Sequence, residues 1–208
     1  MSRFSSDFQS GLIDLMRWRR DVRRFRTDPV DEALLAQCLD TFLFAPSVGL
    51  SEPWRIIRVD SDTARAAALD NFRETNARAL DGYSGDKAKL YSTLKLTGMQ
   101  EAPVQLAVFC DTATAKGAGL GALTMPEMRP YSVVAAITQF WLYARAQGLG
   151  VGWVSILDPA RLRRDLDLPD DWSLVAYLCV GWPEAFSDTP ELEQAGWEDR
   201  RGSIPLEV

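Results

Sequence analysis

Four arginines surround a single acid in residues 19–25, and these residue types could bind an anion and act on it. Guanidinium groups hold phosphate through paired hydrogen bonds and stay charged at any working pH. The carboxylate of Asp21 is expected to be ionised, because the positive charge around it favours that form. The segment therefore predicts either a phosphate site with a chemical group built into it or an exposed turn whose charges neutralise one another.

The composition excludes several other kinds of chemistry. The 208 residues include no histidine, which is the usual proton shuttle and the commonest metal ligand. We therefore expect no metal site, and a cofactor or the substrate itself must carry the difficult chemistry. The three cysteines, Cys38, Cys110 and Cys179, lie far apart in apolar segments, which favours reduced core thiols over disulfides.

Charge and hydrophobicity indicate the class of protein. The net charge of −6 argues against nucleic acid as a partner, because such binding needs a basic surface. No apolar run reaches the ~20 residues of a membrane span, and the first residues lack the layout of a signal peptide. We expect a cytoplasmic protein with no membrane partner, folded as a single domain over residues 1–208.

The elements that must position the arginines follow from the apolar pattern. A first helix, with apolar residues at positions 8, 12, 15 and 16, ends where the arginines begin. Asp31 can cap a second helix, which Pro46 stops. Few strands and much helix predict an α+β fold with a small central sheet covered by helices. The expected later elements are helices over residues 61–80, 86–101, 133–146 and 159–167, strands over residues 54–59, 103–110 and 173–180, and a turn into a strand over residues 148–155.

Three loops are rich in small residues. Residues 45–54 form either a loop where the backbone could approach a flat ligand or a plain connection. Residues 148–155 alternate small and apolar residues before Ser155, which would lie at the mouth of a strand or serve the structure alone. Residues 112–125 contain three glycines but lack the phosphate-binding pattern, which predicts a surface loop.

Two outer segments could cover a ligand. The helices around the break at residues 82–85 could form a lid that consists of residues 72–98, or they could pack as ordinary helices. The C-terminal arm, residues 185–208, has Trp197 as its one clear apolar anchor and is too polar to fold alone. We expect this arm to lie across the body of the protein or across a partner subunit.

Four motifs together resemble the FMN-dependent nitroreductase family. They are Arg-x-x-x-Arg-x-Phe in residues 19–25, Ala-Pro-Ser at 45–47 leading to Pro-Trp at 53–54, Gly-Leu-Gly-Val-Gly-Trp at 148–153, and Gly-Trp-Pro-Glu at 181–184. Each motif is weak alone, but their order and spacing span nearly the whole chain. The family commonly has a small hydroxyl residue where Asp21 stands, and Asn and Gln where Leu50 and Glu52 stand. These departures resemble instead the branch of the family that forms 5,6-dimethylbenzimidazole.

The resemblance implies a three-layer, nitroreductase-like homodimer with an FMN site at each subunit boundary and a C-terminal tail that wraps the partner subunit. Arginines would hold the phosphate and ribityl end of the flavin, Ser47 and Leu96 would line its ring, and Ser155 would approach its reactive edge. Asp21 and Ser155 are the implied catalytic residues. The implied cofactor-binding residues are Arg19, Arg20, Asp21, Val22, Arg23, Ser47, Gly49, Leu96, Ser155, Arg200 and Arg201.

The branch implies a specific activity, in which reduced FMN is both cofactor and substrate and molecular oxygen fragments it. The products would be 5,6-dimethylbenzimidazole, the lower ligand of cobalamin, and erythrose 4-phosphate. A separate NAD(P)H-dependent flavin reductase would supply the reduced FMN. Two alternatives stay open, because fold alone does not fix function. They are an NAD(P)H-dependent FMN nitroreductase or flavin reductase, and a non-catalytic flavin carrier in which Asp21 would be idle.

Overall fold

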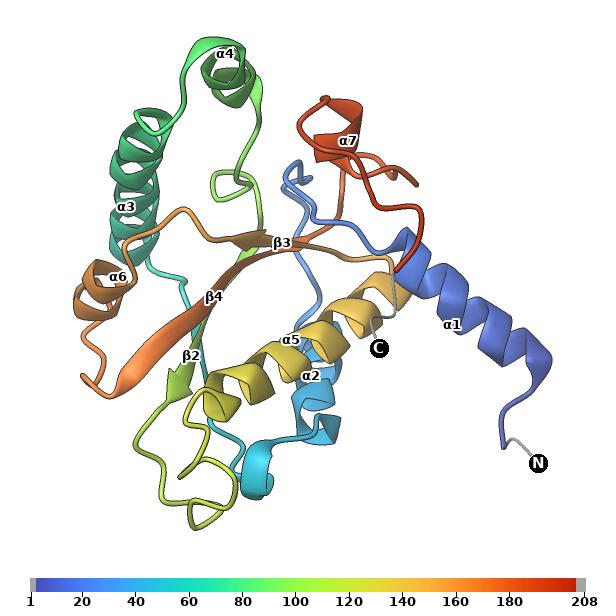
Figure 1. Ribbon diagram of the computed structural model, residues 1–208, viewed down its shortest axis with the longest axis vertical. Coiled ribbons are helices and arrows are strands. Elements are labelled where there is room, and N and C mark those ends of the chain that lie inside the picture. The colour runs from blue at the N-terminus through green and yellow to red at the C-terminus, as the bar shows by residue number, and fades with distance from the viewer. Residues whose placement is uncertain (1–2, 205–208) are drawn as a thin grey trace.

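Within residues 3–204, which the computed structural model describes, four antiparallel strands form one sheet in the order β1-β2-β4-β3 (Figure 1). The strands are β1 (Trp54–Arg58), β2 (Val104–Asp111), β3 (Gly150–Val154) and β4 (Trp172–Gly181). The helices are α1 (Ser6–Trp18), α2 (Glu32–Asp40), α3 (Asp62–Leu80), α4 (Gly85–Thr93), α5 (Met128–Ala146), α6 (Pro159–Asp165) and α7 (Glu191–Gln194), with short 3-10 turns η1 (Thr41–Phe44) and η2 (Val48–Leu50).

The sheet is buried on both faces, as the side chains of β2 show. Leu106 and Val108 belong to the apolar cluster built from α2 and α5, whereas Ala107 and Phe109 belong to the cluster built from α3 and α6. Because successive side chains of a strand point to opposite faces, the helices form one layer on each side of the sheet. This arrangement confirms the predicted α+β fold with a small central sheet covered by helices (Figure 1).

Local signals set most of the element boundaries. The carboxylate of Asp31 accepts a hydrogen bond from the Leu34 amide at 2.9 Å and caps α2. The hydroxyl of Ser61 caps α3 in the same way. Helix α5 is the central helix of the first cluster, and its Phe140 is fully buried. None of the helices within residues 3–204 has the length and apolar character to cross a bilayer.

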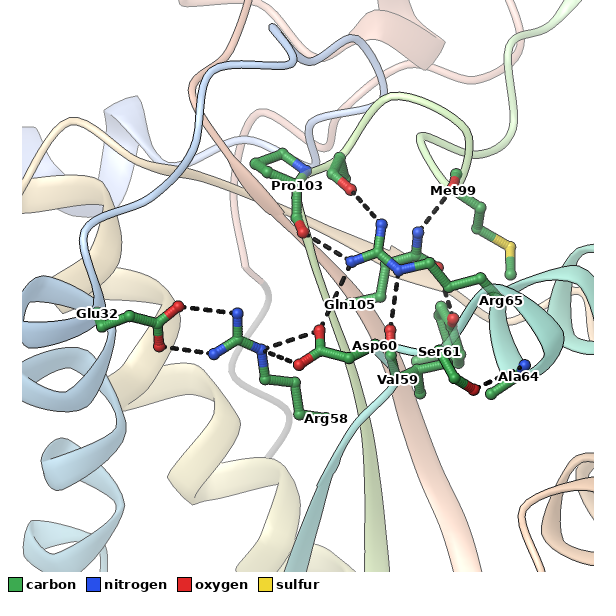
Figure 2. A network of polar contacts seen from close by, with 12 residues as sticks. Glu32, Arg58, Val59, Asp60, Ser61, Ala64, Arg65, Met99, Pro103 and Gln105 are labelled. Carbon is green, nitrogen blue, oxygen red and sulfur yellow. Dashed lines mark hydrogen bonds and ion pairs between the residues drawn. The ribbon is translucent and has the colours of Figure 1, made fainter.

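The helix predicted over residues 86–101 ends at Thr93, so the prediction is wrong for its second half. Buried side chains bind carbonyl groups of the chain beyond α4. The Gln105 side chain donates to the Met99 carbonyl at 2.7 Å, and Arg65 donates to the Pro103 carbonyl at 2.7 Å (Figure 2). Residues 94–103 therefore form a connecting loop whose path is fixed by the core.

A network of hydrogen bonds lies behind this loop, and it ends at the hydroxyl of Tyr177, which is protonated. The Tyr177 hydroxyl donates to the Gln105 side-chain oxygen at 2.6 Å, and burial raises the pKa of Tyr177. At the other end of the same network, Arg58 of β1 holds Glu32 of α2 through two hydrogen bonds of 2.6 and 2.9 Å (Figure 2). The network thus links both helical layers to the sheet.

The three cysteines are buried and unbridged, which confirms the prediction of reduced core thiols. Burial raises the pKa of Cys38 and of Cys110 to about 11 and that of Cys179 to about 12. These thiols are therefore protonated at neutral pH, and a thiol is a poor nucleophile compared with a thiolate.

The arginine segment, residues 19–25, runs along the free edge of β3 before it enters the core. Asp21 pairs with Val151 of β3 as a parallel bridge, and the Val22 amide donates to the Val151 carbonyl at 3.0 Å. The ring of Phe25 is only 1% exposed. The segment is thus fastened to the sheet at both of its ends.

Glycines make this close approach possible. A Cβ on Gly152 would lie 2.1 Å from the Val22 carbonyl oxygen, and a Cβ on Gly98 would lie 2.4 Å from the Phe25 ring. Real Cβ atoms do not approach other atoms so closely, so any larger residue forces the backbone to move. Gly98 and Gly152 therefore make room for the arginine segment of the same chain.

Gly152→Ala is expected to destabilise the protein by about 1–3 kcal/mol, the usual cost of overpacking a well-packed interior. The added methyl group would meet a backbone carbonyl, which cannot rotate away as a flexible side chain can. Urea unfolding monitored by tryptophan fluorescence measures the change.

Gly11→Ala in α1 is the matched control, because its Cβ would meet nothing within 4 Å and alanine favours the helix. This control should unfold at the same urea concentration as the unaltered protein or a higher one. An unchanged midpoint for Gly152→Ala would show that the segment tolerates displacement.

Candidate functional site

The arginine segment forms the floor of a pocket of about 200 Å³, which we call the arginine pocket. Its other wall comes from the C-terminal arm, around α7 and beyond it. Residues from the two ends of the chain therefore meet there (Figure 1). The lining residues are Arg19, Arg20, Asp21, Arg23, Pro190, Glu191, Leu192 and Arg200.

The segment begins where α1 stops, and a tryptophan of α5 holds that point. Arg19 has extended backbone dihedral angles, which end the helix after Trp18. The indole nitrogen of Trp141 donates to the Arg20 carbonyl at 3.3 Å, and the Arg19 guanidinium lies 4.7 Å from the centre of the same ring. A cation over an aromatic face is stabilised without an acidic partner.

Arg20 has more donors than its protein partners use. One terminal nitrogen donates to the Arg19 carbonyl at 2.6 Å and the other to the Asp188 carbonyl, but its buried Nε has no partner among the described residues. Burial lowers the pKa of Arg20, and nearby Arg200 and Arg19 lower it further. A buried, unpaired donor among like charges fits a bound anion such as a phosphate group.

Asp21 links the segment to β3 through its side chain. One carboxylate oxygen accepts the Trp153 amide hydrogen at 2.7 Å, and the other accepts from Arg23 Nε at 3.0 Å. The side chain is 32% exposed and lines the arginine pocket. A carboxylate offers about four lone-pair positions, so these two hydrogen bonds leave room for contact with a ligand.

The loop after α4 reaches the same place. Arg23 donates to the Lys95 carbonyl at 3.2 Å, which fixes the loop beside the arginine segment. Leu96 and Val22 line a narrow gap there together with Asp21. The structure therefore brings together six of the eight predicted cofactor-binding positions that precede residue 100, namely Arg19, Arg20, Asp21, Val22, Arg23 and Leu96.

Ser155 and the two tail arginines lie at the margins of this site. Ser155 is exposed and follows β3, whose last residue, Val154, lines the narrow gap. Arg200 lines the arginine pocket, and its Nε lies 3.9 Å from a Glu193 carboxylate oxygen. Arg201 is exposed and is not part of the pocket lining.

Ser47 and Gly49 lie elsewhere, near the amino-terminal end of α5. The Val48 amide donates to the Ser132 hydroxyl at 3.0 Å, whereas Trp141, nine residues further along α5, holds the arginine segment. Nine residues of helix span about 13–14 Å. The structure therefore separates these two predicted residues from the arginine pocket of the same chain.

The sequence reasoning missed Arg145, a guanidinium that is only 3% exposed at the end of α5. It lies between the rings of Trp18 at 3.6 Å and Phe186 at 4.1 Å, and two of its nitrogens have no partner among the described residues. Burial lowers the pKa of Arg145, as does the neighbouring Arg20. An arginine among alanines at a helix end looks like an ordinary cap, so no sequence signal marked it.

The sequence model of the nitroreductase family matches residues 16–182. A 5,6-dimethylbenzimidazole synthase from Rhodospirillum rubrum is 53% identical over 198 residues, which cover 95% of this chain and 94% of that protein. A protein of the same name from Rhodobacter capsulatus is 48% identical over 204 residues, covering 98% and 97%. Among solved structures, iodotyrosine deiodinase bound to FMN and 3-iodo-L-tyrosine shares the fold with a TM-score of 0.73 at 20% identity, covering 94% of this chain and 97% of that one. The chain therefore belongs to the nitroreductase family.

Proposed function

We propose that this protein is a 5,6-dimethylbenzimidazole synthase, which binds reduced FMN and promotes its fragmentation by molecular oxygen. The observation that carries the proposal is the 53% identity, over nearly the full length of both chains, to a curated relative of that name. The arginine pocket supports it, because it combines four guanidinium groups, one of them with an unpaired donor, with the carboxylates of Asp21 and Glu191.

The arginines would bind the phosphate and ribityl end of the flavin. The unpaired Nε of Arg20, together with Arg19, Arg23 and Arg200, offers the charge and the donors that a phosphate dianion needs. Leu96 and Val22 lie beside the arginine segment and would contact the flavin from there. Arg201 lies outside the lining of this pocket and would reach the phosphate only if the arm shifts.

Bound reduced FMN would supply the redox chemistry: it would react with molecular oxygen, and its fragmentation would release the dimethylbenzimidazole base and erythrose 4-phosphate. Asp21 would act as a general base toward a ribityl hydroxyl or carbon, since its carboxylate lies in the pocket and has free lone pairs. Ser155 would donate or accept a hydrogen bond near the reacting edge of the flavin.

The protein would act as a homodimer with composite sites. If Ser47 and Gly49 contact the same flavin as the arginines, a second subunit must bring them, because α5 separates the two groups within one chain. Exposed apolar surface supports this assembly: α1 has no buried residue, and six large apolar side chains on it or just before it are exposed. The exposed ones are Phe4, Phe8, Leu12, Ile13, Met16 and Trp18.

Reduced FMN would come from a separate NAD(P)H-dependent flavin reductase in the cytoplasm. Aerobic incubation with FMN, NADH and such a reductase should yield 5,6-dimethylbenzimidazole, detected by chromatography and mass spectrometry. Omitting the reductase should abolish the product and leave the NADH unconsumed. Oxidation of NADH without the reductase would identify a conventional nitroreductase, and stable bound FMN with neither reaction would identify a flavin carrier.

Asp21→Asn is expected to lower the product formed per bound FMN by about 10²–10⁴-fold, which is typical for loss of a general base. Asparagine can still accept the Trp153 amide hydrogen, so the segment should stay on β3. FMN binding should be similar or slightly tighter, because a negative charge leaves the phosphate pocket.

The unfolding midpoint and the FMN affinity serve as the controls for Asp21→Asn. If the carboxylate only holds Arg23, the variant loses stability or affinity while product per bound FMN stays near that of the unaltered protein. That result would exclude Asp21 as the essential base.

Leu12→Glu in α1 is expected to weaken the dimer at least tenfold, because it places a charge on the exposed apolar face of the helix. Sedimentation equilibrium at micromolar concentration measures the association. Ser10→Glu adds the same charge to the opposite, polar face of α1 and should leave the dimer intact. A monomeric unaltered protein would rule out the composite site.

A further inference from the structure

Trp197 in the C-terminal arm docks on an aromatic pair at α4. The ring of Trp197 lies 5.4 Å from Tyr83 in an edge-to-face arrangement and 6.1 Å from Tyr91, and the two tyrosines stack on each other at 4.9 Å. The Lys87 ammonium group lies 4.4 Å from the centre of the Trp197 ring and donates to the Trp197 carbonyl. The arm and α4 are therefore joined at one point, which we call the aromatic latch: Tyr83, Lys87, Tyr91 and Trp197.

The latch completes a closed circle of contacts around the arginine pocket. Arg24 pairs with Glu191 of α7 at 2.8 Å, which attaches the start of the arm to the arginine segment. At the other end of α4, the Lys95 carbonyl accepts a hydrogen bond from Arg23 at 3.2 Å. The segment, the arm, α4 and the connecting loop are thus linked in one ring of contacts beside the pocket.

The latch holds the part of the arm that follows α7 more firmly than the Arg24–Glu191 pair does. The Arg24–Glu191 pair is about half exposed on the arginine side, and exposed ion pairs contribute little to stability. Aromatic pairs and a cation over a ring contribute more, and Tyr91 is only 6% exposed. Arg200 follows Trp197 by three residues and reaches the pocket lining, so the docking of Trp197 decides where Arg200 lies.

We propose that Trp197 is a positioning residue for the anion end of the flavin site. Its docking on Tyr83 and Tyr91 holds Arg200 against the arginine pocket and makes the arm and α4 open together. The inference rests on the proposed FMN site and goes beyond it, because it assigns the control of flavin entry and release to a contact that lies outside the pocket lining.

The first test compares the release rate of oxidised FMN from Trp197→Ala and Trp197→Phe, measured by stopped-flow fluorescence. The alanine variant should release FMN about tenfold faster, as loss of an aromatic contact with its cation predicts. The phenylalanine variant keeps a ring and should stay within about twofold of the unaltered protein. Glu198→Ala, an exposed change in the same arm, is the control and should have no effect.

The second test asks whether Trp197 acts through Arg200. Trp197→Ala combined with Arg200→Ala should release FMN no faster than the faster of the two single variants, because an undocked Arg200 has already left the pocket. Multiplicative effects of the two changes would show that the residues act independently and would overturn the positioning role.

The third test needs no flavin. In Trp197→Ala the amides of residues 85–93 should exchange hydrogen faster than in the unaltered protein, because α4 loses its contact with the arm. Unchanged exchange there would refute the joint opening. Failure of the proposed function is a separate result: an unaltered protein that forms no dimethylbenzimidazole, whatever its FMN release rate, would contradict the activity and leave the latch supported.

Discussion

The site depends on one constraint, which is the close approach of the arginine segment to the sheet. The segment forms no helix or strand of its own, and among the described residues its backbone is bridged only at Asp21 to Val151 and at Phe25 to Pro183. Its position is set because Phe25 is buried where Gly98, Gly152 and Gly181 leave room for it. A ring fixed in a close-packed interior cannot shift by even a few tenths of an ångström without cost. The backbone of the arginines is therefore held as rigidly as the core. Preorganised binding of a charged ligand requires such rigidity.

The charges of the site leave an excess of positive charge for an anionic ligand, because four arginines and two acids line the pocket. Arg19 lies on the ring of Trp141, and Arg145 lies between Trp18 and Phe186. Aromatic faces stabilise a cation while leaving its charge available, whereas a carboxylate partner would neutralise it. The one acid in the segment, Asp21, is kept in place by the Trp153 amide as well as by an arginine. The pocket thus keeps an excess of positive charge in the absence of ligand.

Local physical signals made most of the fold predictable. Caps such as Asp31 and Ser61, and the apolar run of β2, depend on neighbouring residues only, and the structure confirms them. The connecting loop of residues 94–103 was not predictable, because side chains from α3 and β2 decide its path. The motif glycines were visible in the sequence, but their spatial partners, Val22 and Phe25, were not.

The candidate site was predictable to a similar degree. The sequence singled out the arginines, Asp21 and Leu96, which the structure brings together, because a dense charge cluster and a known motif mark them locally. It could not show that Ser47 lies across α5 from them, since that separation follows from helix packing over long sequence distances. The bridge between Asp21 and Val151 also has a consequence for solubility. β3 is an outer strand of the sheet, and the arginine segment occupies its free edge, so unpaired backbone groups that could recruit another chain are covered by a charged strip. The residues proposed to bind the ligand would then also prevent edge-to-edge aggregation. Selection for ligand binding would therefore preserve resistance to aggregation, and the reverse would hold as well.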